Sequence, residues 1–141
     1  MYEIIQKAHS GVAYLALTVL VVAVINALLG YTSKKAFTDK DRKIALFALI
    51  FCHIQLLLGL ILYFVSPMGF DVLGEMSDSL LRKTSLEHPL TNILAIALIT
   101  VGWSTHKKQQ TDQAKFTKIA LFYFIGLVLL LAMIPWNLWF N

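Results

Sequence analysis

Four histidines are the residues of this 141-residue chain best suited to carry chemistry. His9, His53 and His88 lie in or beside long apolar blocks, whereas His106 lies among lysines in a polar turn. None has the HxxxH or HExxH spacing that is typical of zinc sites. Histidines on different helices instead suit haem, whose iron takes two axial ligands from facing helices. His9, His53 and His88 are therefore candidate haem ligands.

Depth in a membrane separates these candidates. At about 1.5 Å per helical residue, His9 and His88 fall within one turn of the same boundary, and His53 lies about 15 Å deeper. Two axial ligands of one iron must lie at nearly the same depth, so we expect His9 and His88 to form the pair. His53 would then contact a propionate, serve a second haem, or be structural, bonded to Asn26 or to a backbone carbonyl. Met133 is an alternative ligand, although methionine there is more often packing.

Small residues share a face with two of the histidines. Steps of three and four residues from His9 reach Ala13, Ala16, Ala23, Ala27 and Gly30, and steps from His88 reach Asn92, Ala95, Ile99 and Gly102. Such faces let a neighbouring backbone or a flat cofactor approach closely. The simpler alternatives are a His9 that only touches headgroups and a His88 that is exposed to water. On the second block the small-residue face includes Gln55, and His53 projects about 130° away from it.

The elements that position these residues are membrane helices. The chain is 58% hydrophobic and 14% charged, with a mean hydropathy of +0.72. These values exclude a soluble enzyme, a disordered tail and, with Cys52 as the single cysteine, a disulfide scaffold. Residues 8–30, 43–66, 85–105 and 117–134 are long enough to cross a bilayer and must be helical there. We predict one all-α domain over residues 1–141, an up-down-up-down integral membrane four-helix bundle with short cytoplasmic turns.

Lysine and arginine give the expected orientation. Nine of the twelve lie near the 31–42 and 106–116 turns, and only Lys7, Arg82 and Lys83 lie on the opposite side. Basic residues favour the cytoplasmic side, so both termini are predicted on the outer side. The net charge of +4 is thereby assigned to a membrane surface and not to nucleic acid.

The connecting segments carry further expectations. Pro67 should end the second helix, and the stretch that follows it could hold a short surface helix. Residues 84–87 have capping-box spacing, with Pro89 in the first turn of the third helix. Glu87 either caps that helix or serves a quinol site, and His106 is expected to be a solvated turn residue.

Several segments together resemble a known family: His9-Ser10-Gly11, residues 51–59 (FCHIQLLLG) running on to Pro67, Glu87-His88-Pro89-Leu90, and Ile134-Pro135-Trp136. They resemble a small bacterial four-helix membrane family filed as cytochrome b or cytochrome b-like, over nearly the whole chain. The resemblance implies b-type haem between helices, with His9, His53 and His88 in the positions of its motif histidines.

Two classes of function follow. The first is an electron-transfer subunit of the bacterial inner membrane, with haem b, that exchanges electrons with a quinone or with partner membrane subunits. The second is a cofactor-free structural or assembly subunit of a larger complex, whose histidines hydrogen-bond between helices. A stand-alone enzyme is less expected than either. A transporter is disfavoured because the spans hold no carboxylate except Glu87 at an edge.

Overall fold

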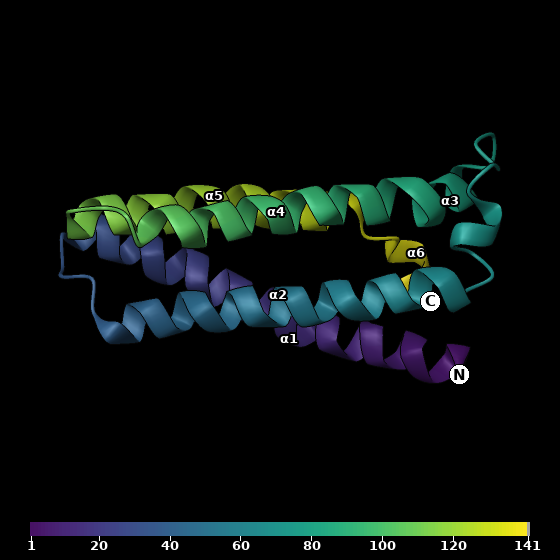
Figure 1. Cartoon of the computed structure of the whole chain (residues 1–141), viewed down its shortest axis with the longest axis horizontal. Helices are drawn as coiled ribbons and strands as arrows, with labels where there is room; N and C mark the ends of the chain where they lie inside the picture. The colour runs from purple at the N-terminus through teal and green to yellow at the C-terminus, as the bar shows by residue number, and fades with distance from the viewer. Residues whose placement is uncertain (141) are drawn as a thin grey trace.

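A computed structural model of the chain describes residues 1–140, and within them all regular structure is helical. The long helices are α1 (Tyr2–Ser33), α2 (Asp39–Val65), α4 (His88–His106) and α5 (Asp112–Met133). A 3₁₀ turn (Phe70–Val72), α3 (Ser79–Arg82) and a π-helical segment (Lys83–Glu87) precede α4, and α6 (Trp136–Trp139) follows α5. The long helices alternate in direction, with both termini at one end (Figure 1). The predicted up-down-up-down helical bundle is confirmed.

The four long helical stretches are apolar enough to cross a membrane. The candidate spans are Tyr2–Ser33, Asp39–Val65, Ser79–His106 and Asp112–Met133. Each is longer than the span predicted from the sequence, although the second and the fourth end one residue earlier than predicted. Large apolar side chains cover their outer surface; Leu57 is 60% exposed and Phe64 is 65% exposed. Outward apolar side chains on helices of this length are what a lipid environment requires. The protein is a multi-pass membrane protein.

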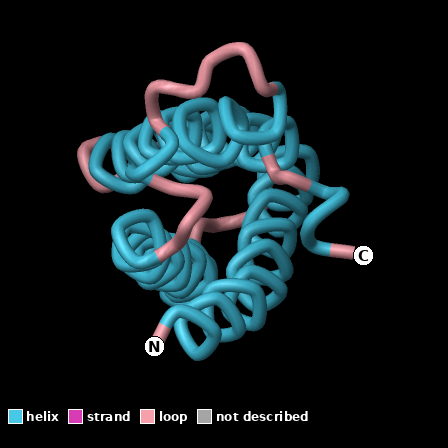
Figure 2. The backbone as a smooth tube through the Cα atoms, turned by 90° about the vertical axis from the view of Figure 1, so that its right-hand side faces the viewer, coloured by secondary structure: helices cyan, strands magenta, loops and turns pink. Residues whose placement is uncertain are grey.

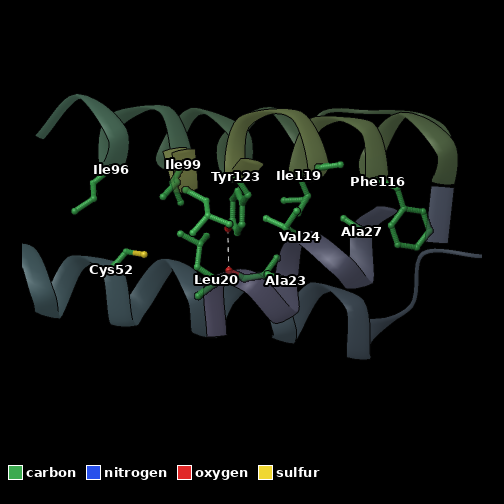
Figure 3. Packing of buried hydrophobic residues seen from close by; sticks show 14 residues of the cluster. Leu20, Ala23, Val24, Ala27, Cys52, Ile96, Ile99, Phe116, Ile119 and Tyr123 are labelled. Atoms are coloured by element: carbon green, nitrogen blue, oxygen red, sulfur yellow. Dashed lines mark hydrogen bonds between the residues drawn. The ribbon is translucent and has the colours of Figure 1, made fainter. Parts of the chain in front are cut away.

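Small residues bring the helices together. α1 contacts α2 and α5, and α4 contacts α5 and α2, so the four helices surround a common axis (Figure 2). The face of α1 predicted from its small residues is buried, with Ala16, Ala23 and Ala27 no more than 5% exposed. Leu20 and Tyr123 fill the space between the two layers of helices (Figure 3). The Tyr123 hydroxyl donates a 2.8 Å hydrogen bond to the Ala45 carbonyl, which ties α5 to α2.

A buried carboxylate organises the turn between α1 and α2. Thr38 and Asp41 form a capping box at the start of α2, and Asp41 is 2% exposed. Asn26 of α1 donates to Asp41 Oδ1 at 2.9 Å, and Lys35 Nζ lies 2.8 Å from Oδ2. Asn26 is therefore the partner of Asp41. The alternative that paired it with His53 is wrong, because the His53 ring nitrogens lie next to the Leu49 carbonyl and the Thr100 hydroxyl instead.

The third membrane helix begins earlier than predicted. Asp78 caps it by accepting from the amides of Leu80 and Leu81, so residues 84–87 lie inside the helical stretch and do not start it. Within this stretch, Pro89 lacks the N–H that would bond to the carbonyl four residues before it, at Ser85. The helix widens into its π-helical segment there. The Tyr63 hydroxyl of α2 donates to the freed Ser85 carbonyl at 2.9 Å.

His106 also differs from its prediction. It is 2% exposed and lies at the end of α4, against the rings of Phe37 and Trp103. Its Nδ1–H donates to the Trp103 carbonyl. The expectation of a solvated turn residue is wrong because Phe37, which is distant in sequence, folds over the imidazole.

Candidate functional site

A cavity of about 220 Å³ opens at the end of the bundle that holds both termini. α1, α2, α4 and the segment from α5 to α6 all contribute to its wall, which is mostly apolar. Its polar lining includes His9, Gln55, His88 and Asn92. We refer to this space as the histidine cavity. It has the form expected of a cofactor pocket, with apolar walls and a few convergent polar groups.

The imidazole rings of His9 and His88 lie close together in the wall of the histidine cavity, in an edge-on arrangement. Their ring centres are 6.3 Å apart, and the two ring planes are nearly perpendicular, at 88°. A metal ion held by two imidazole nitrogens at about 2 Å each would separate the ring centres by about 6 Å. The structure thus brings together the two histidines that residue depth had paired, at a spacing that suits one metal centre.

The end of α5 orients His88. Pro135 cannot continue a helix, so the last carbonyls of α5 lack their usual backbone donors. His88 Nδ1 lies 3.0 Å from one of them, the Met133 carbonyl, and a carbonyl can only accept. Nδ1 therefore carries the proton and Nε2 keeps its lone pair. A hydrogen bond of this kind is the usual way in which proteins fix the tautomer of a ligating histidine.

Two side-chain amides complete the polar part of the cavity. Gln55 Nε2 donates to the His9 carbonyl at 2.9 Å and lies 3.2 Å from His9 Nδ1. Asn92 Nδ2 lies 3.3 Å from His88 Nε2. The oxygens Gln55 Oε1 and Asn92 Oδ1 are buried without a hydrogen-bond partner in the described residues. Buried acceptors are nearly always satisfied in proteins, so these two call for a donor from water or from a bound group.

The small-residue face of α2 makes room for His9. A Cβ atom at Gly59 would lie 3.1 Å from His9 Cε1, closer than ordinary van der Waals contact. Glycine at this position therefore lets the imidazole rest against the α2 backbone. Helical periodicity places Gln55 and Gly59 on the same face of α2, but the site predicted from the sequence includes neither residue. An amide within a membrane span was the signal that could have identified Gln55.

The remaining candidates, His53, Met133 and Glu87, do not line the histidine cavity. His53 is exposed on the outer surface of α2, where its Nδ1 lies 2.8 Å from the Leu49 carbonyl. This agrees with the backbone-carbonyl alternative, and its face is the one that helical periodicity predicts. Met133 contributes its backbone carbonyl to His88. Glu87 Oε1 lies 3.6 Å from Arg82 Nε, and Glu87 precedes α4 without a capping hydrogen bond from its side chain.

The chemistry of the histidine cavity is that of a two-histidine site. Among residues 1–140, no cluster of three or more histidine, cysteine or acidic side chains could share a metal ion. No protein-family model matches the chain, and neither the comparison with curated proteins nor that with solved structures finds a match. Inference about function therefore depends on the geometry of the histidine cavity.

Proposed function

We propose that the protein is a b-type cytochrome-like electron-transfer subunit that holds haem b between His9 and His88. The observation that carries the proposal is the 6.3 Å separation of the centres of two imidazole rings that line one apolar cavity. Haem iron needs two axial ligands only, which the two histidines can supply from α1 and α4. When bound, haem would supply one-electron redox chemistry at this end of the bundle.

The lining residues fit such a group. Ala13, Ala16 and Gly59 are part of the cavity wall and offer little side-chain volume next to the histidines. The apolar wall would exclude water from a bound haem and favours an uncharged imidazole, which is the ligating form. Gln55 and Asn92 present two unpaired carbonyl oxygens, acceptors for a donor on the bound group or on water beside it. His53 would take no part in this centre.

Electrons must leave through another molecule. The chain has one cysteine and so cannot build an iron–sulfur cluster by itself. A quinone in the bilayer or a partner membrane subunit is the proposed exchange partner. The basic ends of the helices carry nine of the twelve lysines and arginines, which favours the cytoplasmic side of a bacterial inner membrane for that end. The histidine cavity then lies near the periplasmic side.

Difference spectra test the proposal. The protein is expressed with ample haem, and reduced-minus-oxidised spectra are recorded for the wild type and for His9→Ala, His88→Ala and His53→Ala. We expect a Soret band in the wild type, its loss in the first two variants, and its retention in His53→Ala, the matched control on the lipid-facing surface. Absence of the band from the wild type refutes haem binding. Loss in His53→Ala alone refutes the proposed ligand pair.

The second candidate is a cofactor-free structural subunit. The contact that favours it is the 2.9 Å bond from Gln55 to the His9 carbonyl, which already joins α2 to α1 without any cofactor. Interhelical bonds of this kind stabilise membrane bundles. If the wild type binds no haem, and Gln55→Leu lowers its resistance to unfolding by detergent, this role replaces electron transfer.

Labelling of single cysteines tests the orientation. In a Cys52→Ala background, Ser77→Cys should react with an impermeant thiol reagent added to intact cells, because Ser77 precedes α3 at the end of the bundle that holds the termini. Lys108→Cys, in the turn between α4 and α5, should react only after the cells are opened. The reverse pattern would invert the assignment.

A further inference from the structure

A second hollow lies at the end of the bundle opposite the histidine cavity. The turn before α2, the first turn of α2, the end of α4 and the start of α5 enclose it. Its lining residues are Phe37, Thr38, Asp39, Arg42, His106, Lys107 and Lys115. We call it the basic hollow, because three of its residues are cationic and Asp39 alone is acidic.

Only part of this positive charge is neutralised by the protein. Asp39 lies 3.2 Å from Arg42 Nε and 3.0 Å from Lys43 Nζ, so its carboxylate is already shared by two cations. Lys107 and Lys115 form no ion pair with the acidic side chains of residues 1–140. Their ammonium groups lie instead over aromatic rings, 5.5 Å from the centre of Trp103 and 5.8 Å from the centre of Phe37. Two positioned cations therefore lack an anion.

A largely buried imidazole also lines the basic hollow. His106 is 2% exposed, and its Nδ1–H is committed to the Trp103 carbonyl. Its Nε2 has no hydrogen-bond partner in the part of the chain that the structure describes, and the residue lines the hollow. This nitrogen is accessible from the hollow, unlike the buried and unpaired Gln55 Oε1 and Asn92 Oδ1. With its proton on Nδ1, the neutral ring can accept at Nε2 from water that hydrates a bound anion.

We propose that the basic hollow binds the phosphate group of an anionic phospholipid, with Lys107, Lys115 and Arg42 as its cationic contacts. The hollow lies at the ends of the membrane spans, which is the level of lipid headgroups. Basic pockets between membrane helices are known to take such headgroups. A bilayer presents phosphodiesters at this level continuously, which favours a lipid over dissolved phosphate as the source.

Lipid binding to the purified protein tests the assignment. Full-length protein in dodecyl maltoside is titrated with phosphatidylglycerol or phosphatidylcholine, and the lipid-bound fraction is measured by native mass spectrometry. The test variant is K107Q/K115Q. The control is K34Q/K108Q, which removes the same charge from the same end of the bundle at positions outside the hollow. All four lysines are at the surface or half-buried, and a helical circular dichroism spectrum checks each fold.

We expect phosphatidylglycerol to bind in preference to phosphatidylcholine. Each lysine near a membrane surface contributes to the free energy of binding an anionic lipid. The loss of two such contributions should weaken phosphatidylglycerol binding about 25-fold in K107Q/K115Q. The control should stay within about threefold of the wild type. Equal losses in the two variants, or equal binding of the two lipids, would overturn the site. Full displacement of phosphatidylglycerol by millimolar inorganic phosphate would overturn the lipid as its natural ligand.

Discussion

Replacing Asp41 by asparagine should destabilise the protein substantially, although the two side chains have the same shape. The Asp41 carboxylate is 1% exposed and accepts hydrogen bonds from three residues. Asn26 Nδ2 donates to Oδ1, and Lys35 Nζ bonds to both oxygens. The backbone N–H and the hydroxyl of Thr38 each donate to Oδ2 at 2.8 Å. The carboxylate therefore joins α1, the turn and α2.

The size of the effect follows from these contacts. In Asp41→Asn the least costly arrangement places the new NH₂ at the Oδ1 position, where Asn26 can turn its own amide oxygen towards it. The two Thr38 bonds then become neutral, and each loses about 1 kcal/mol relative to a bond with a charged acceptor. The pair with Lys35, whose side chain is 44% exposed, adds at most about 1 kcal/mol because water screens it. The sum is about 2 to 3 kcal/mol.

Unfolding by sodium dodecyl sulfate in mixed micelles, followed by circular dichroism, measures this change in free energy. Asp39→Asn is the matched control, because Asp39 lies two residues away on the same turn and is 65% exposed. We expect no measurable shift of the midpoint in that variant. Asp41→Asn with wild-type stability, or an equal loss in both variants, would refute the reasoning that burial gives the carboxylate its structural role.

Three further predictions use the same unfolding assay. Gly126→Ala should cost about 1 to 3 kcal/mol, because the new Cβ would lie 2.6 Å from Ile99 Cγ1. Gly11→Ala, with nothing within 4 Å, should cost nothing, and equal losses would contradict the packing argument. Tyr123→Phe should cost about 0.6 to 1.7 kcal/mol through its interhelical hydrogen bond, and no loss would show that this bond is unimportant. His106→Ala should destabilise the bundle and leave haem content unchanged. Loss of haem would show that His106 affects the histidine cavity at the other end of the bundle.

The number and direction of the helices could be predicted from the sequence. Lipid offers no hydrogen bonds to an open backbone, so each long apolar block had to become a helix. Periodicity of 3.6 residues also placed Ala16, Ala23 and Ala27 on a buried face and His53 off the small-residue face of α2. These predictions succeed because hydropathy and helical phase are local properties.

Local sequence patterns could not predict the helix start at Ser79 or the environment of His106. Residues 84–87 have capping-box spacing, yet the side chain of Asp78 accepts hydrogen bonds from the free amides of an earlier helix start. The Tyr63 hydroxyl donates to the carbonyl that Pro89 leaves without a backbone donor. His106 is buried by Phe37, which lies 69 positions earlier in the chain. Both outcomes depend on contacts between segments that are distant in sequence.

For the candidate site too, one part could be predicted from the sequence and the other depends on tertiary structure. Counting residues from the span ends was enough to expect His9 and His88 at one depth, because the rise of a helix is constant. Their separation of 6.3 Å, the Met133 carbonyl that orients His88, and the amides of Gln55 and Asn92 depend on how each helix is rotated about its axis. That rotation is set by side-chain packing among all four helices, so the tertiary structure alone decides which polar groups meet in the histidine cavity.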